Sequence, residues 1–469
     1  MTSKINFILN DKELSIETAS GNTLLDFIRN EAKLSGTKEG CREGDCGACT
    51  ILLGDIVDNE LHYKTANSCL YPIGKVNGKH VITIEGINSD KLTPIQHAYA
   101  DENASQCGFC TPGFIISTTG YLLENDKINI DAAIKSVAGN ICRCTGYVSI
   151  KRALETIIEQ MKFAETENSM EILINNKYIP EYFNTIKERL KNLEIKEINN
   201  CDGTLVVGGG TDLYIQREDE LIEDNPIFIL DSLSRKIWKD ENSIFISGNT
   251  TFEEFACSKI IQNIIPSIKE DNNLIASLPI RNSATLAGNI VNASPIGDLT
   301  IILLSLNAVI HLIGNNKKRE TPLREFFYGY KKFDKKESEI IEKIELNLPK
   351  DKLFFNFEKI SKRTHLDIAS VNSAIMLSLK EDQIKLCGLS FGGVSPIPLY
   401  MKETSAYLEG KSLNAETLEN ALNIINDEIT PISDVRGCEE YKRLLAKQIF
   451  KSHFMELIPD KITMKSFVK

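Results

Sequence analysis

Residues 40–49 read Gly-Cys-Arg-Glu-Gly-Asp-Cys-Gly-Ala-Cys, and the next cysteine in the chain is Cys69. Four thiolates are the ligand set of a [2Fe–2S] cluster, which takes two on each iron. Three glycines among the first three cysteines let the backbone fold closely round the sulfurs and point N–H groups at them. The stretch therefore predicts a loop built round a metal cluster, with the ligands Cys41, Cys46, Cys49 and Cys69.

The spacing Cys-x4-Cys-x2-Cys-x19-Cys is the plant-type ferredoxin pattern. A zinc site or a set of buried free thiols is the alternative interpretation. Zinc sites usually pair two short Cys-x2–4-Cys units, which this stretch lacks. In residues 5–17, apolar and polar side chains alternate on both sides of a polar break at Asn10-Asp11-Lys12. This pattern indicates a β-hairpin ahead of the cysteine loop.

A second set of cysteines follows in the segments Gln106-Cys-Gly-Phe-Cys-Thr-Pro-Gly and Asn140-Ile-Cys-Arg-Cys-Thr-Gly-Tyr. Pro112 and Gly146 place each cysteine pair at a helix boundary, so two facing loops would supply a second cage of four thiolates. Zinc is again the alternative, although Cys-x-Cys is unusual for structural zinc. The predicted ligands are Cys107, Cys110, Cys142 and Cys144.

Composition and charge exclude some classes of function. Eight of the twelve cysteines lie between Cys41 and Cys144, and such clustering in a reducing compartment favours metal binding over disulfides. A net charge of −11 argues against nucleic acid as the main partner, because phosphate binding needs a basic face. The N-terminus shows no signal segment and no apolar stretch reaches the roughly 20 residues that span a bilayer. We expect a cytoplasmic protein without a membrane partner.

Two later segments suggest a flavin. Val206-Val-Gly-Gly-Gly-Thr-Asp-Leu213 follows a predicted strand, and its glycines would let backbone amides approach a pyrophosphate, although glycine runs also form plain turns. Residues 280–298 are rich in small polar side chains. Thr285, Asn289 and Ser294 offer hydrogen bonds there, and Asp298 offers a carboxylate for a ribose hydroxyl.

The two cysteine sets together resemble the iron–sulfur region of xanthine dehydrogenases and related molybdenum hydroxylases, and residues 280–298 resemble the second FAD-binding stretch of that family. The resemblance implies an α+β multidomain fold with a ferredoxin-like β-grasp domain (1–88), a helical [2Fe–2S] bundle (89–164), a linker (165–175), a two-part α+β FAD-binding domain (176–350) and a C-terminal α+β flavoprotein domain (351–469). The FAD contacts that it implies are Val206, Val207, Gly208, Gly209, Gly210, Thr211, Asp212, Leu213, Thr285, Leu286, Ala287, Gly288, Asn289, Asp298, Ile341 and Lys359.

Some of these residues have simpler explanations, and some positions depart from the family. Lys359 alone would read as a solvated surface lysine, and Ile341 as ordinary core. Ala287 stands where the family usually has glycine, and Thr300 replaces a common proline. The remaining departures are Ile275 at an often aromatic position, Lys331 in place of arginine, and Val148-Ser149 where the family often has Arg-Pro.

The length resembles that of the iron–sulfur/FAD small subunit of a xanthine dehydrogenase, with no room for the large molybdopterin domain. The resemblance therefore implies a large molybdopterin-binding partner subunit, in a dimer of heterodimers. The partner would hydroxylate hypoxanthine or xanthine, and electrons would pass through two [2Fe–2S] clusters to FAD and on to NAD+, with O2 as a side route. No residue of this chain is a clear acid–base catalyst. The alternatives are a subunit of another molybdenum hydroxylase, acting on an aldehyde or an N-heterocycle, and a free-standing iron–sulfur flavoprotein diaphorase.

Overall fold

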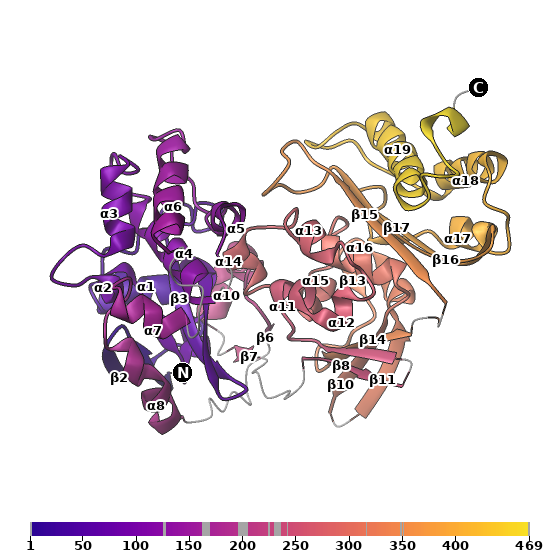
Figure 1. Ribbon diagram of the computed structural model, residues 1–469. Helices are drawn as coiled ribbons and strands as arrows, with labels where there is room; N and C mark the ends of the chain where they lie inside the picture. Colours follow the sequence, from indigo (N-terminus) through magenta and orange to yellow (C-terminus); the bar gives the residue numbers. More distant parts are fainter. Residues whose placement is uncertain are drawn as a thin grey trace. The chain divides into compact units, whose positions relative to one another are not determined.

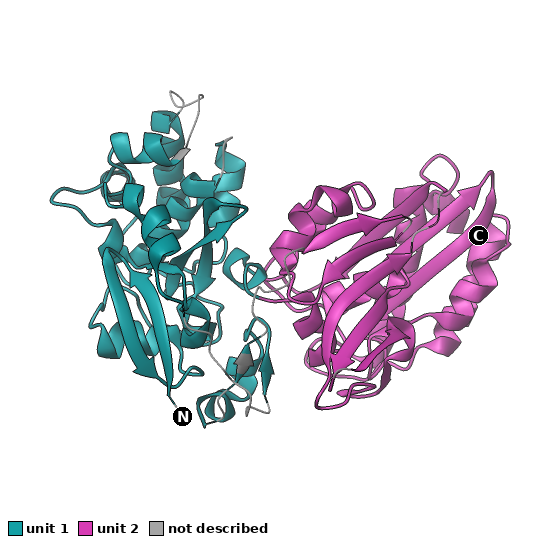
Figure 2. Cartoon of the chain, turned by 90° about the horizontal axis from the view of Figure 1, so that it is seen from below, with its two compact units in different colours: residues 1–229, 277–283 teal, residues 230–276, 284–469 magenta. Residues whose placement is uncertain are grey.

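The structure is a computed structural model that describes residues 2–124, 128–161, 169–195, 205–223, 226–228, 236–241, 243–315, 317–347, 349 and 351–467. The chain divides into two compact units, which Figure 2 colours separately. Unit 1 comprises residues 1–229 and 277–283, and unit 2 comprises residues 230–276 and 284–469. Each unit is described by itself.

A five-stranded sheet begins unit 1, in the order β2-β1-β5-β3-β4. The hairpin predicted for residues 5–17 is confirmed, with its turn at Asn10 in the left-handed region (φ 53°). Successive residues of β3 face opposite sides of the sheet. Ile51 and Leu53 therefore pack with Phe7 on one side, and Leu52 packs against the helices on the other. The strands are Ser3–Leu9 (β1), Lys12–Thr18 (β2), Thr50–Val57 (β3), Glu60–Asn67 (β4) and His80–Ile82 (β5).

Helices cover the Leu52 side of this sheet (Figure 1). Helix α3 begins with a capping box formed by Thr93 and Gln96. Pro94 occupies its first turn, where a proline is favoured. Helix α4 is buried from Gly113 to Leu123, because it lies between β3, β4 and the other helices. The helices on that side are Ile84–Ile87 (α2), Pro94–Asp101 (α3), Thr111–Glu124 (α4), Ile130–Ser136 (α5), Val148–Met161 (α6), Ser169–Asn175 (α7) and Phe183–Asn192 (α8). Helix Leu24–Asp26 (α1) and a π-helical turn at Phe27–Glu31 pack on the other side with Ile51 and Leu53. Two 3-10 turns lie at Ser68–Leu70 and Ile73–Val76.

The segment expected to be a linker, residues 165–175, differs from that expectation where the structure describes it. Ser169–Asn175 form helix α7, since Leu173 and Ile174 are buried in the helical core. Residues 162–168 lie outside the described residues. Unit 1 also contains short elements from the expected FAD-binding domain: Val206–Val207 (β6), Leu213–Gln216 (α9), Glu218–Glu223 (α10), Ile227–Phe228 (β7) and Leu278–Arg281 (α14).

Unit 2 contains two sheets. The first has the order β11-β10-β14-β9-β8, and its inner face carries Ile246, Ile310 and Ile344. Its elements are Ile237–Asp240 (β8), Ser243–Ser247 (β9), Phe252–Cys257 (α11), Lys259–Gln262 (α12), Ile268–Asn272 (α13), Leu286–Asn292 (α15), Asp298–Ser305 (α16), Val309–Gly314 (β10), Lys317–Pro322 (β11), a 3-10 turn at Leu323–Glu325, the hairpin Phe327–Gly329 (β12) with Lys332–Phe333 (β13), and Ile340–Asn347 (β14).

The second sheet has helices on both faces, as Figure 1 shows. Ser390 donates to the Ile301 carbonyl of α16, while its neighbour Leu389 shares a buried cluster with Leu408 of α17, so β17 is buried on both sides. Gly388 allows the close approach of α16, because a Cβ there would lie 2.0 Å from the Ser305 carbonyl oxygen. The elements are Leu353–Ile360 (β15), Val371–Lys380 (β16), Gln383–Gly392 (β17), Leu399–Tyr400 (β18), Lys402–Leu408 (α17), Ala415–Glu428 (α18), Glu439–Leu457 (α19) and a 3-10 turn at Met464–Phe467.

Candidate functional site

The first quartet (Cys41, Cys46, Cys49 and Cys69) is brought together by strand pairing. Thr50 of β3 pairs with Asn67 of β4, which places the residues just outside the two strands next to each other. The Ser68 amide and hydroxyl both donate to the Cys49 carbonyl, at 3.3 and 2.8 Å. As a result the sulfurs of Cys49 and Cys69 lie 3.4 Å apart.

Backbone N–H groups face the other two thiols of the first quartet. The Glu43 amide lies 3.3 Å from the Cys41 sulfur. A hydrogen bond with Cys46, together with backbone N–H groups of residues 43, 45 and 46, lowers the pKa of the Cys41 thiol to about 5. Such amides stabilise negative charge on sulfur, which is what a cluster bound by four thiolates requires.

Arg42 fixes the outer side of this loop. Its backbone is in the left-handed region (φ 56°), and its guanidinium reaches Asp26 on α1 and Glu39 in the loop itself. A third carboxylate, that of Glu218 on α10, lies 3.2 Å away. Hydrogen bonds with Glu39 and Asp26 raise the pKa of Arg42, so the residue stays charged.

The second quartet (Cys107, Cys110, Cys142 and Cys144) gathers at the start of α4 and in the loop before α6. The sulfurs of Cys107 and Cys144 lie 3.7 Å apart. The Thr145 hydroxyl donates to the Cys142 sulfur at 3.1 Å and lowers the pKa of that thiol against the effect of burial. Burial raises the pKa of Cys110 to about 12. Cys107 and Cys144 are exposed, whereas Cys142 is buried.

Both quartets fit a metal cluster. In each, two sulfurs lie 3.4 or 3.7 Å apart. Two thiolates on one tetrahedral metal ion lie roughly 3.8 Å apart when the metal–sulfur bonds are about 2.3 Å. The other two thiols of each quartet, Cys41 with Cys46 and Cys110 with Cys142, are also joined by a hydrogen bond. Four thiols arranged as two pairs suit the two irons of a [2Fe–2S] cluster. An amide in the first quartet and a hydroxyl in the second donate hydrogen bonds to the thiols.

The loops of the two quartets touch each other. The Ile141 amide donates to the Cys46 carbonyl at 2.9 Å, which links the residue before Cys142 directly to a member of the first quartet. Gly47 makes this approach feasible, because a Cβ there would lie 2.4 Å from the Gly139 carbonyl oxygen.

The glycine loop (residues 206–213) lies in unit 1 beside the first quartet. Gly210 has φ 82°, and a Cβ on it would lie 3.3 Å from the Leu70 carbonyl oxygen, next to Cys69. Val207 and Tyr214 share a buried apolar cluster with Cys49 and Cys69. Sequence reasoning missed two residues that fix the loop: Lys75 donates to the Gly208 carbonyl at 2.7 Å, and Tyr214 donates to the Gly21 carbonyl at 2.7 Å.

The second flavin segment lies in unit 2. The Thr285 hydroxyl caps α15 by accepting from the Gly288 amide at 3.1 Å. Two of the departures noted above are explained by local contacts. Thr300 donates to the Asn289 side chain through its amide (3.0 Å) and its hydroxyl (2.7 Å), which a proline lacks. Ala287 is accommodated because the residue opposite it, Gly248, has no side chain.

Asp298 and Lys359 are brought together, as expected of two residues of one site. Lys359 Nζ donates to Asp298 at 2.8 Å and to the Leu274 carbonyl at 2.9 Å. Only 3% of the Lys359 side chain is exposed, so it is not a solvated surface lysine. Asn372, which lies opposite Lys359 in the β15–β16 register, donates to the other carboxylate oxygen of Asp298. Asn372 was not identified from the sequence, and no local motif marks it.

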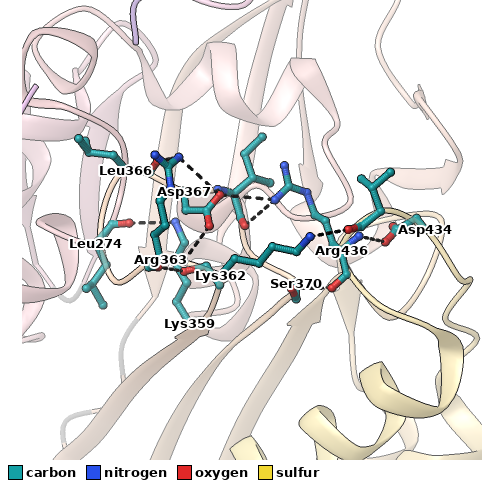
Figure 3. A network of polar contacts seen from close by, with 12 residues as sticks. Leu274, Lys359, Lys362, Arg363, Leu366, Asp367, Ser370, Asp434 and Arg436 are labelled. Atoms are coloured by element: carbon teal, nitrogen blue, oxygen red, sulfur yellow. Dashed lines mark hydrogen bonds and ion pairs between the residues drawn. The ribbon is translucent and has the colours of Figure 1, made fainter. Parts of the chain in front are cut away.

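Beyond Lys359, a polar network fixes the loop between β15 and β16 (Figure 3). Asp367 accepts from the Arg363 amide at 3.0 Å and lies 3.6 Å from Arg436. Lys362 donates to the Val435 carbonyl at 2.8 Å, and Ser370 donates to the Arg436 carbonyl at 2.9 Å. These contacts attach the segment after Lys359 to residues 434–436.

The remaining candidates are positioned as follows. Ile341 is 3% exposed and lies in β14, where a Cβ on Gly248 would meet its carbonyl at 2.2 Å. Ile275 is buried. Lys331 adopts φ 55° and donates to the Asn292 side chain at 2.8 Å. The glycine loop and the segment 284–298 belong to different units.

Four families match consecutive parts of the chain. They are the 2Fe-2S iron-sulfur cluster binding domain (residues 7–73), the [2Fe-2S] binding domain (83–155), the FAD binding domain in molybdopterin dehydrogenase (191–350) and the CO dehydrogenase flavoprotein C-terminal domain (357–457). The chain belongs to the molybdenum hydroxylase family. The family resemblance and the multidomain α+β fold expected from the sequence are thereby confirmed.

Similar proteins of this family are longer. The chain is 28% identical to a xanthine dehydrogenase of Emericella nidulans, over 97% of this chain and 38% of that protein. It is 26% identical to an aldehyde oxidase of Homo sapiens, over 97% of this chain and 39% of that protein. The chain thus spans less than half the length of these relatives. The carbon monoxide dehydrogenase of Hydrogenophaga pseudoflava shares the fold over 55% of this chain and 90% of that chain, with a TM-score of 0.51 and 22% identity.

Within the described residues, none of the helices combines the length and the apolar composition needed to cross a bilayer.

Proposed function

We propose that this chain is the electron-transfer subunit of a xanthine dehydrogenase. It would receive electrons from a molybdenum site on a partner subunit and deliver them, through two [2Fe–2S] clusters and FAD, to NAD+. The two quartets would hold the clusters, and the glycine loop with Thr285–Asn289, Asp298, Ile341 and Lys359 would hold FAD. A flavin at this position accepts single electrons and releases a hydride.

The observation that carries this proposal is the order of contacts in unit 1. The second quartet adjoins the first through the Ile141–Cys46 hydrogen bond. The first quartet adjoins the glycine loop through Leu70 and Gly210. The three predicted redox sites therefore form a linear series in which the first quartet is central. Such a series is what a chain of one-electron carriers between a donor and a flavin requires.

The outer end of the series supports a partner subunit. Cys107 and Cys144 are exposed, and the apolar side chains around the second quartet are exposed as well. An electron donor docked there would cover apolar surface that is otherwise in water. The exposed fractions are 46% for Phe109, 46% for Ile141, 39% for Tyr147 and 61% for Val148. We propose that the molybdopterin-binding subunit docks on these residues.

Purification of the native complex tests the proposal. We expect about four irons and one FAD per chain, together with a large molybdenum-containing protein. Addition of xanthine or hypoxanthine should then reduce NAD+. Zinc in place of iron, or a chain without flavin, would contradict the electron-transfer function. Iron and flavin without a partner would instead identify a free-standing diaphorase.

A second candidate is a subunit of a molybdenum hydroxylase that acts on an aldehyde or an N-heterocycle. The similarity to an aldehyde oxidase, at 26% identity against 28% for a xanthine dehydrogenase, keeps this candidate close to the first. The same complex decides between them, because reduction of the clusters by an aldehyde but not by a purine would identify an aldehyde-oxidising enzyme.

A further inference from the structure

Asn140 is a buried side chain at the junction of the two quartets. Only 4% of the residue is exposed. Its Oδ1 accepts from the Ser117 hydroxyl at 2.7 Å, and its Nδ2 donates to the Gly47 carbonyl at 3.0 Å and to the Thr50 hydroxyl at 3.4 Å. Gly47 lies between Cys46 and Cys49, Ser117 lies on α4 after Cys110, and Asn140 itself precedes Cys142. One amide group therefore connects three ligand-bearing segments.

The surroundings of Asn140 leave little room for adjustment. A Cβ on Gly113 would lie 2.3 Å from the Gly47 carbonyl oxygen and 3.0 Å from Asn140 Nδ2. A Cβ on Gly47 would lie 2.6 Å from the same nitrogen. Backbone from both quartets is thus packed directly against the amide. If the side chain at position 140 lost these hydrogen bonds, the close packing would let the polar groups find new partners only by moving one of the ligand loops.

The residue type matches the hydrogen bonds to Ser117 and Gly47, which are the shortest of the three that the side chain makes. An amide carries an acceptor and a donor on one short side chain, and here the acceptor faces a hydroxyl while the donor faces a carbonyl. Aspartate has the same shape but would place an oxygen against the Gly47 carbonyl oxygen. The adjacent residue, Ile141, makes the backbone hydrogen bond to Cys46, so a shift of Asn140 would be passed to that bond.

We propose that Asn140 is a positioning residue that fixes the separation of the two iron–sulfur clusters and thereby the rate at which electrons pass between them. This inference rests on the proposed function, since it requires both quartets to hold clusters. It assigns to one side chain a role separate from ligation, namely holding two ligand loops at a constant distance.

The test uses the holoprotein reduced with dithionite and examined by electron paramagnetic resonance. Each reduced [2Fe–2S] cluster carries one unpaired electron, and the splitting between two such spins falls with the cube of their separation. In Asn140→Asp we expect both cluster signals and the full iron content, with an altered splitting. Ser117→Ala, which removes the partner of Oδ1 and adds no charge, should shift the splitting in the same direction by less.

Asn67→Asp is the matched control. Asn67 is also buried, and its amide donates to the Gly44 carbonyl of the first quartet at 2.8 Å. The atoms nearest to a Cβ built on Gly44 belong to Leu70, Ile280 and Asn67, and none of these residues lies in the second quartet's loops. This variant should therefore alter the first cluster's own signal but keep the splitting. Unchanged splitting in Asn140→Asp and Ser117→Ala, with both clusters present, would overturn the inference. If Asn140→Asp lost a cluster, Ser117→Ala alone would decide. A wild-type protein without two such signals would overturn the proposed function instead.

Discussion

Lys359 and Asp298 form an ion pair of 2.8 Å between β15 and the first residue of α16, although 61 positions separate them in the sequence. Both side chains are largely buried, with 3% and 12% exposed. A buried ion pair contributes little net stability compared with apolar residues, because desolvation opposes the attraction. We therefore propose that the pair is retained for the flavin site and not for stability.

Lys359→Met should separate that role from stability. We expect a loss of about 3–5 kcal/mol in the free energy of unfolding, because the buried carboxylate of Asp298 loses its cationic partner and keeps the hydrogen bond from the amide of Asn372. The double variant Lys359→Met/Asp298→Asn should regain much of this stability but not FAD. Lys442→Met is the control, since the Lys442 side chain is 3% exposed, as that of Lys359 is, and pairs with Asp434, which is 40% exposed. Flavin content and urea unfolding report both effects, and a double variant that binds FAD normally would refute the assignment.

Cys49→Ser should remove one cluster. Cys49 is buried against Cys69. A serine hydroxyl is less acidic than a thiol, and its oxygen is a harder ligand than sulfur. We expect iron content to fall by about half, with loss of one of two paramagnetic signals after reduction. Cys387→Ser is the control, because Cys387 lies buried in β17, within unit 2. Equal iron loss in both variants would show a general folding defect.

Gly210→Ala should weaken FAD binding. Gly210 has φ 82°, where an alanine is strained by about 1 kcal/mol or more, and its Cβ would also approach the Leu70 carbonyl. Gly410→Ala carries the same backbone strain at φ 78° with no atom within 4 Å of the new Cβ. Titration of apoprotein with FAD should therefore show a raised Kd for the first variant alone. Equal affinity in both would exclude the glycine loop from the flavin site.

Unit 2 should respond to acid through His453. Burial lowers the pKa of His453 to about 3, and the ring lies between Asn356 and Ser373, at 2.9 Å from each. The unfolded chain takes up this proton below about pH 6.5, so the stability that neutral His453 provides is present at pH 7 and lost as pH falls. The loss is about 2 kcal/mol at pH 5.

Comparison of wild type with His453→Gln isolates this effect. Burial raises the pKa of Asp271 to about 7, so this residue makes stability change with pH in the opposite direction. Both proteins contain Asp271, so its contribution cancels in the comparison. Urea unfolding followed by Trp238 fluorescence reports on unit 2, where that residue stacks on Phe245. At pH 7 the variant should have a smaller free energy of unfolding than the wild type, and at pH 5 this difference should be smaller by about 2 kcal/mol. A deficit independent of pH would contradict a neutral buried imidazole.

Local sequence patterns predicted those parts of the fold that form within a single short segment. Alternation indicated the hairpin of β1 and β2. Cysteine spacing similarly grouped the eight thiols into two quartets, although Cys69 and the pair Cys142 and Cys144 lie in segments apart from the other ligands of their quartets. The helix in the expected linker was missed, since Leu173 and Ile174 carry too little periodicity to reveal a core contact.

Contacts between distant segments could not be predicted. Asn372 reaches Asp298 only because β15 and β16 pair in one particular register, and Tyr214 reaches Gly21 across 193 positions. Each of these side chains is an ordinary polar or aromatic residue in its own segment. Their roles arise from tertiary packing, which a single sequence does not encode in a local motif.

The glycine loop and α10 belong to unit 1, together with the ferredoxin-like sheet, and this has a consequence for engineering. A chain cut at position 175 would leave Leu25, Leu70 and the buried sulfur of Cys69 open to water, because Val207, Tyr214 and Leu221 cover them. Residues 205–228 must therefore accompany the N-terminal fragment in any expression of separate fragments. A chimera that takes its flavin domain from a relative must likewise keep apolar residues at the positions of Val207, Tyr214 and Leu221.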